Sequence, residues 1–330
     1  MEGKVELQAK QKTKRQLIME KYRNELGVGI AFILFFVVIC IISPYFFTSR
    51  NLSNLASQCA TIAILAIGET YVVLTGGIDL SVGSVMGFSS MVAAMVMVST
   101  QSVALGVIIG LIAGMVCGVV NGLLVGYAKL PGFIVTLGMM QIARNVDYLM
   151  CGGVGVTGLP ESIKSFAKAK LFEGVYWYYI VIVVLFIIAG WMLRNTKLGR
   201  YTYAIGSNEK STRLSGVNVK LFTALPYFIA GLMAGIGGIV LASRFGAVDP
   251  NYGDGSEMDA IAAVVIGGAS LAGGKGSMIG TVIGVLLMAT IKNGLDLLGV
   301  SPYWQGVTVG IVIIGVLLIG KASELLKKKV

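Results

Sequence analysis

The segment Thr75–Gly87, TGGIDLSVGSVMG, interrupts a run of residues that is otherwise apolar enough for a membrane interior. It holds a double glycine, Asp79 and the serines Ser81 and Ser84. Backbone N–H and C=O groups without partners are too costly to face lipid, so such a break must be buried in protein or line a wet cavity. Asp79 and Ser81 also favour the start of a new helix. The segment therefore predicts a discontinuous helix beside a transport path.

The composition indicates an integral membrane protein. Of the 330 residues, 56% are hydrophobic and 13% are charged, whereas a soluble domain carries about 25% charged residues. The 45 glycines suit close helix packing in lipid. Histidine is absent, which removes the commonest proton relay and metal ligand. The four cysteines form no CxxC pair, so we expect neither metal nor redox chemistry from them.

The net charge of +10 is concentrated in three basic regions that flank apolar stretches. These regions are the N-terminal segment 1–26, the loop 194–220 and the tail 321–330. The positive-inside rule predicts that all three are cytoplasmic, and their distribution argues against nucleic-acid binding. We therefore expect a transmembrane domain over 27–320, with both termini in the cytoplasm.

Apolar runs predict an all-α fold with about ten membrane-spanning segments. Their expected ranges are 26–42, 57–74, 80–98, 104–127, 133–150, 175–193, 222–241, 260–268, 278–298 and 303–319. The eighth is short and ends in the glycine-rich segment 267–277, which predicts a second broken helix. The similar sequences VVLTGG from Val72 and VVIGG from Val264 suggest a weak internal repeat.

The fourth apolar run carries a glycine at every fourth position from Gly106 to Gly126. Each step of four residues advances about 400° around a helix, so the stripe drifts by about 40° per step. This predicts a slowly winding groove that lets neighbouring backbones approach closely, and it favours packing over substrate contact. Asn121 is the polar exception on this segment.

The ionisable residues Glu69, Arg144 and Asp147 fall inside predicted spans. An intramembrane carboxylate such as Glu69 is either functional or a partner in helix packing, and the sequence leaves both possibilities open. Arg144 and Asp147 are three residues apart, so they share a helix face and are expected to pair. Whether they line a mouth or lie at the lipid surface also stays open.

The loop 194–220 predicts a short amphipathic helix in which Ser207 is the N-cap and Gly216 follows the last turn. Glu209 and Arg213 stand in the favourable i, i+4 order. Such a helix suits docking to a soluble partner, although a helix on the membrane surface would have the same pattern. On the other side, Asp249, Asp254, Glu257 and Asp259 form an acidic outer segment, which either receives a soluble protein or is simply solvated.

Three motifs in this order resemble the membrane permeases of bacterial ABC importers for monosaccharides, of the ribose, xylose and galactoside type. They are TGGIDLSVGSVMG from Thr75, AIGSNEKSTRLSGVNV from Ala204 and AVVIGGASLAGGKGSMIGTVIGVLLMATIKNGL from Ala263. The resemblance covers about residues 53–319. It implies the ABC importer permease fold in the bacterial inner membrane, a second permease subunit, identical or different, and a soluble sugar-binding protein outside the cell. It also implies a cytoplasmic ATPase with two nucleotide-binding halves, which would hold ATP and Mg²⁺, whereas this chain would be non-catalytic and bind no cofactor.

The predicted function is therefore ATP-driven sugar uptake by alternating access. The residues expected beside the substrate path are Thr75, Gly76, Gly77, Asp79, Ser81, Ser84 and Asn121. By the resemblance, the residues that couple to the ATPase are Gly206, Ser207, Asn208, Glu209, Arg213, Leu214, Ser215 and Gly216. The residues expected to dock the binding protein are Asp249, Asn251, Tyr252 and Asp254.

Two alternatives remain at this stage. The first is an ion-coupled secondary transporter that uses Asp79 or Glu69, and the second is a membrane scaffold without transport. The missing Walker A motif means that this chain cannot supply ATP hydrolysis itself. Among importer substrates, a furanose-like signal, inositol and nucleosides stay open beside the common sugars.

Overall fold

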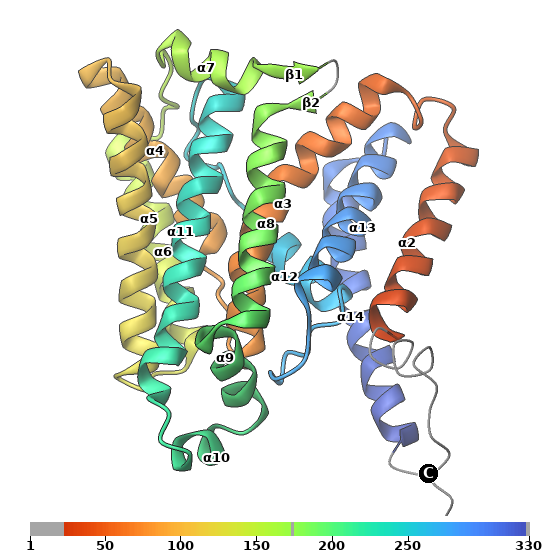
Figure 1. Ribbon diagram of the computed structural model, residues 1–330. Coiled ribbons are helices and arrows are strands. Elements are labelled where there is room, and N and C mark those ends of the chain that lie inside the picture. The colour runs from red at the N-terminus through yellow and green to blue at the C-terminus, as the bar shows by residue number, and fades with distance from the viewer. Residues whose placement is uncertain (1–22, 173–174, 328–330) are drawn as a thin grey trace, which may run out of the picture.

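The computed structural model describes residues 23–172 and 175–327, which form a bundle of helices with two short strands at one end (Figure 1). The long helices are α2 (Arg23–Ile42), α3 (Ser49–Leu74), α4 (Val82–Thr100), α5 (Val103–Gly126), α6 (Gly132–Cys151), α8 (Trp177–Asn195), α11 (Val219–Phe245), α13 (Met278–Leu297) and α14 (Pro302–Lys327). The shorter elements are α7 (Glu161–Lys168), β1 (Lys170–Phe172), β2 (Val175–Tyr176), α9 (Lys197–Ser207), α10 (Glu209–Leu214) and α12 (Ser256–Ile266).

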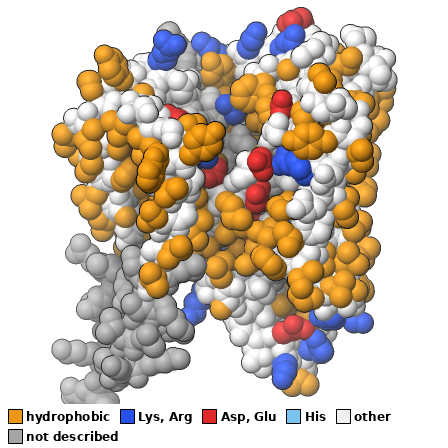
Figure 2. All heavy atoms as spheres, turned by 180° about the vertical axis from the view of Figure 1, so that it is seen from behind, with side chains coloured by type: hydrophobic (Ala, Val, Ile, Leu, Met, Phe, Trp, Pro, Cys, Tyr) orange, Lys and Arg blue, Asp and Glu red, His pale blue; other side chains and the backbone are white. Residues whose placement is uncertain are grey.

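The described residues include seven helices that are long and apolar enough to cross a membrane: α2, α3, α4, α5, α8, α11 and α13. The helices α6 and α12 pack against members of this set, and α14 packs against α12 and α13. The chain is thus an all-α, multi-pass membrane protein. Hydrophobic side chains cover most of the height of the face in Figure 2, and charged side chains lie at its two ends and in a further group in its upper middle. The broad apolar cover is expected for a protein surrounded by lipid.

The two ends of the bundle differ in sequence. We call the end that carries α9 and α10 the basic end; α2 begins and α14 ends on this side (Figure 1). The opposite end carries α7 and the antiparallel pair β1–β2. Most of the predicted basic leader, residues 1–22, lies outside the described residues. The predicted tail boundary at residue 320 falls within α14, because the helix continues to Lys327.

The core is built around α3. Every residue from Ile62 to Leu74 is buried, because α8, α11, α12 and α13 all pack around this helix. By contrast, α2 and α8 expose one broad apolar face each, which is the pattern of a helix at the lipid boundary.

The glycine stripe on α5 is buried along its length and changes neighbour as it winds. Near the opposite end, a Cβ at Gly110 would lie 2.8 Å from Ala93 Cβ on α4. Further along, a Cβ at Gly118 would lie 2.5 Å from the carbonyl oxygen of Tyr227 on α11. A Cβ at Gly126 would also lie 2.5 Å from a carbonyl oxygen of α11, that of Lys220. The predicted groove is confirmed: it passes from α4 to α11 and brings their backbones against α5.

Two interruptions of the helices lie side by side. Break 1 comprises residues 75–81 between α3 and α4, and break 2 comprises residues 267–277 between α12 and α13. The backbone N–H of Gly274 donates to the carbonyl oxygen of Leu74 at 2.9 Å. Both predicted broken helices are therefore confirmed, and the two similar sequences that precede them end at neighbouring places in the bundle.

The segment 246–255, predicted as an outer loop, turns back into the bundle before α12. Its residues Tyr252 and Gly253 pack their carbonyl groups against Gly87 and Gly83 in the first two turns of α4. Gly253 and Gly255 adopt positive φ angles of 81° and 73°, which lets the backbone turn in this narrow space. As a result, α12 starts inside the bundle, which explains how a helix of only 11 residues reaches break 2.

Candidate functional site

Break 1 is held by a chain of buried hydrogen bonds. Asp79 Oδ1 accepts from the backbone N–H of Ser81 at 2.8 Å and from its hydroxyl at 2.6 Å. Asn121 Nδ2 on α5 donates to Ser81 Oγ at 2.9 Å. The Asp79 carboxylate thus lies at the start of α4, where the helix dipole favours negative charge. The predicted helix start is confirmed, with Ser81 immediately before the first helical residue.

The residues expected along the substrate path fall into two groups. Asp79, Ser81, Ser84 and Asn121 are buried in the packed interior. The other group, Thr75, Gly76 and Gly77, is partly or fully exposed. The structure therefore brings all seven to one place, with the exposed glycines at the surface of break 1 and the polar network behind them.

Three further side chains shape break 1. Glu69 Oε1 accepts from the backbone N–H of Asp79 at 3.3 Å, which supports the packing interpretation of this carboxyl group. Thr136 on α6 accepts from the N–H of Leu80 at 3.1 Å. The hydroxyl of Tyr227 on α11 lies so close to Gly77 that a Cβ there would approach it to 2.5 Å. Sequence reasoning missed Thr136 and Tyr227, because isolated polar residues on apolar helices give no signal of what they contact.

At the basic end, α10 protrudes as a short exposed helix. Its N-cap is Asn208, whose Oδ1 accepts from the N–H of Ser211 at 2.9 Å. The predicted Ser207 cap is wrong, because Ser207 is still the last helical residue of α9 and the chain becomes extended only at Asn208. Leu214 is 90% exposed at the end of α10. Gly216, with φ of 79°, ends the turn as expected.

Charges hold α10 against a neighbouring turn. Glu209 forms the expected ion pair with Arg213 and a second one, at 3.2 Å, with Lys129 from the turn between α5 and α6. Partial burial would raise the pKa of Glu209, but the hydrogen bonds and charges of Lys129 and Arg213 outweigh it and lower the pKa below its ordinary value. The pair is therefore formed at neutral pH.

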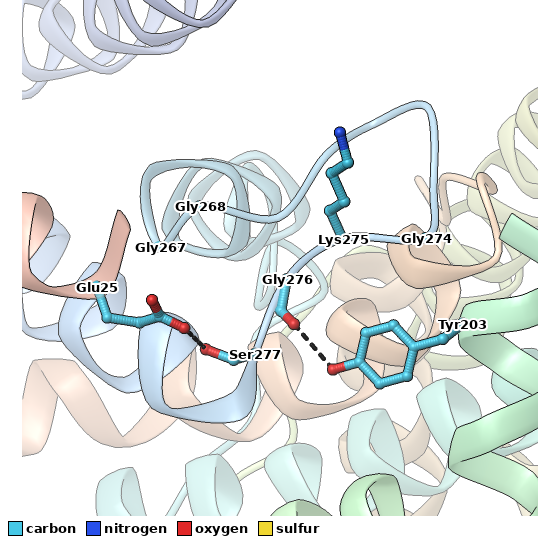
Figure 3. A pocket seen from close by; sticks show the side chains of 8 residues that line it. All are labelled: Glu25, Tyr203, Gly267, Gly268, Gly274, Lys275, Gly276 and Ser277. Carbon is cyan, nitrogen blue, oxygen red and sulfur yellow. Dashed lines mark hydrogen bonds between the residues drawn. The ribbon is translucent and has the colours of Figure 1, made fainter. Parts of the chain in front are cut away.

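Helix α9, which precedes α10, contacts the end of α3 and break 2. Gly206 on α9 packs against the carbonyl oxygen of Leu74 and the backbone of Gly273 and Gly274. Figure 3 shows the Tyr203 hydroxyl donating to the carbonyl oxygen of Gly276, at 2.8 Å. A displacement of α9 would thus bear directly on the end of α3 and on break 2.

Arg144 on α6 binds the segment 246–255, which turns back into the bundle and is called the re-entrant segment below. Its Nη1 donates to the carbonyl oxygens of Pro250 and Tyr252, at 2.8 and 2.9 Å. The predicted Arg144–Asp147 pair is wrong, because the guanidinium group of Arg144 donates to these carbonyl oxygens instead. Asp147 is fully buried, and neither of its carboxylate oxygens has a hydrogen-bond partner among the described residues.

The residues of the acidic outer segment differ in their exposure to solvent. Asn251 and Asp254 are exposed, Asp249 and Tyr252 are partly buried, and Tyr148 donates to Asn251 Oδ1 at 2.6 Å. Glu257 and Asp259, predicted as part of the same exposed patch, are buried instead, because α12 begins inside the bundle. Asp259 pairs with Lys292 on α13 at 2.6 Å. Across the described residues, no group of three or more acidic, cysteine or histidine side chains could hold a metal ion.

Membrane-spanning helices with two adjoining breaks and a protruding helix at the basic end define a transport permease. The model of the family described as "Branched-chain amino acid transport system / permease component" matches residues 51–317, so the chain belongs to this family. It is therefore the transmembrane permease subunit of a transport system.

Curated relatives cover nearly the whole chain. It is 41% identical over 298 residues to the ribose import permease protein of Escherichia coli (strain K12), across 89% of this chain and 93% of the relative. The corresponding protein of Bacillus subtilis (strain 168) is 41% identical over 321 residues, with 96% and 98% covered. The galactose/methyl galactoside import permease protein of E. coli (strain K12) is 34% identical over 314 residues, with 89% and 93% covered. No solved structure matches the chain.

Proposed function

We propose that this chain is the membrane subunit of an ATP-driven, binding-protein-dependent importer of a monosaccharide. The family describes permeases for branched-chain amino acids, but the relatives above are named for the import of ribose and galactosides. A neutral sugar also fits break 1, in which Asp79 is engaged by Ser81 and the chain offers mostly small and hydroxyl side chains. Nothing in the family or the relatives favours the ion-coupled alternative.

The observation that carries the proposal is that α9, the helix directly before α10, contacts the end of α3 and break 2. Leu214 offers an apolar surface at the basic end, and Gly206 and Tyr203, one to two turns before α10, contact Leu74 and break 2. In this proposal α10 docks into an ATPase, and ATP-driven closure moves α9 as a lever. The close glycine packing of α5 against α4 and α11 lets helices slide by small amounts, and the breaks change the side to which the path opens.

In the proposed assembly this chain has three protein partners beside the lipid bilayer. A second permease subunit, the same chain or a paralogue, completes the path. A cytoplasmic ATPase with two nucleotide-binding halves binds α10 and holds ATP and Mg²⁺. A sugar-binding protein docks at the opposite end, at Asp249, Asn251, Tyr252 and Asp254. This arrangement places the basic end and both termini in the cytoplasm of a bacterial cell, in agreement with the positive-inside rule.

The test is the substitution Leu214→Arg, which puts a charge where the proposed apolar contact with the ATPase is made. Burying an unpaired charge is costly, so we expect co-purification of the ATPase and sugar-stimulated ATP hydrolysis to be lost, while the variant is inserted and folded normally. Leu130→Arg is the matched control, because Leu130 is also an exposed leucine at the basic end but lies outside α10. Uptake of labelled sugar at the normal rate by the Leu214→Arg variant would contradict the proposal that α10 docks into the ATPase.

A further inference from the structure

A hollow at the basic end lies between α2, α8, α9 and the start of α13. It consists of two adjoining cavities of about 300 and about 660 Å³, which share Glu25, Tyr203, Gly276 and Ser277 as lining residues. Figure 3 shows the smaller cavity, with Glu25 on one side, Tyr203 on the other and Lys275 in break 2. The transport mechanism proposed above uses the contact between Tyr203 and Gly276 but assigns no role to the hollow that these residues line.

The larger cavity has an apolar side and a basic side. Trp191 on α8 and Ile279 on α13 are 60% and 58% exposed on the lipid-facing surface of the bundle. Arg194 and Arg200 line the same cavity towards the basic end, from the last turn of α8 and from α9. A tryptophan one turn from an arginine at a helix end is the pattern of the membrane–water interface. The cavity therefore opens at the level of lipid headgroups.

The only acidic group among the lining residues is already engaged. Glu25 Oε1 accepts from Ser277 Oγ at 2.8 Å, and Ser277 is the N-cap of α13. The carboxylate is thus close to the positive end of that helix. Arg194, Arg200 and Lys275 form no ion pair with another described residue, so the hollow carries three cations whose charge is not neutralised within the described part of the chain.

We propose that this hollow binds the phosphate headgroup of an anionic phospholipid from the surrounding leaflet. Arg194 and Arg200 would bind the phosphate, since guanidinium groups match its oxygens in pairs, while the acyl chains lie over Trp191 and Ile279. The lipid is the occupant that the observations favour, because an apolar wall leads directly from the cations into the hydrocarbon. The bound lipid would join α8 to α9, the helix that contacts the end of α3 and break 2. The inference does not depend on which solute is transported.

The experiment is native mass spectrometry of the whole chain, extracted from membranes and exchanged into nanodiscs that contain equal amounts of phosphatidylglycerol and phosphatidylcholine. We expect the wild type to retain phosphatidylglycerol in preference to phosphatidylcholine. Each basic residue at an anionic surface contributes about 1 kcal/mol, or about fivefold in affinity, so R194Q/R200Q should bind phosphatidylglycerol about 25-fold more weakly. Millimolar inorganic phosphate should not displace the lipid, because it lacks the acyl chains.

Lys197→Gln is the matched control for this experiment. Lys197 lies between the two arginines in sequence, is exposed, and does not line either cavity. It should retain the lipid, and R194K/R200K should retain most of it because the charge is kept. Equal retention by the wild type and R194Q/R200Q, or equal retention of both lipids by the wild type, would overturn the proposal. Displacement by inorganic phosphate alone would show a site for free phosphate instead of lipid.

Discussion

At the scale of single residues, Gly118 on α5 and Gly138 on α6 differ in the space around them, although both are helical. A Cβ at Gly118 would lie 2.5 Å from the carbonyl oxygen of Tyr227 and 3.0 Å from Gly231 Cα, both in the backbone of α11. A Cβ at Gly138 on α6 would have no other atom within 4 Å. Backbone atoms cannot rotate away as a side chain can, so the first site has no means of accommodating a methyl group.

We therefore predict that Gly118→Ala destabilises the protein by about 1–3 kcal/mol, the usual cost of overpacking. Gly138→Ala should be neutral or stabilising by up to about 1 kcal/mol, because alanine is the better helix former. Equilibrium unfolding of both variants in mixed micelles measures the difference. If the two substitutions had the same effect, the stripe would not be a close-packed seam.

At the scale of elements, the joint between α9 and break 2 decides whether a movement at the basic end reaches the path. The Tyr203 hydroxyl forms the one side-chain hydrogen bond between α9 and break 2 among the described residues. Tyr201, two residues earlier, packs its ring against Phe222 instead, with ring centroids 4.7 Å apart. The two tyrosines thus have different mechanical roles on the same helix.

On the proposed mechanism, Tyr203→Phe should lower sugar uptake per ATP hydrolysed by about fivefold, because a net hydrogen bond contributes about 1 kcal/mol. Binding of the ATPase should be unchanged, since α10 is intact. Tyr201→Phe removes the same atom from α9 and should leave coupling as it is. The ratio of uptake to ATP hydrolysis in reconstituted vesicles measures this, and an unaltered ratio in Tyr203→Phe would show that the joint transmits no movement.

At the scale of the whole molecule, the structure places α9, α10, the start of α2 and the end of α14 on one side (Figure 1). The proposed orientation makes this the cytoplasmic side. We predict that, in a variant without its native cysteines, Leu214→Cys reacts with a membrane-impermeant maleimide only in inside-out vesicles. Val154→Cys, in the exposed loop after α6, should react only from outside. The reverse labelling pattern would invert the proposed orientation.

The sequence by itself determined the class of protein and the places where its helices break. Apolar length and glycine content follow directly from what lipid demands of each residue, so break 1, break 2 and the glycine groove were predictable. Of the ten expected spans, seven correspond to described helices that are long and apolar enough to cross a membrane, whereas α6, α12 and α14 do not meet that measure. The short helix α10 and its Glu209–Arg213 pair were predictable for a similar reason, because both depend on neighbours within one turn.

Only the tertiary structure decided which residues meet across the bundle. The Arg144–Asp147 pair failed because Arg144 is held by carbonyl groups from a segment about 100 residues away. Glu257 and Asp259 were expected at the surface, but the re-entrant segment carries them inside. Contacts such as Tyr203 with Gly276, or Gly206 with Leu74, likewise depend on how separate helices pack. Local patterns record the preferences of neighbouring residues, whereas these contacts are set by the relative positions of helices far apart in sequence.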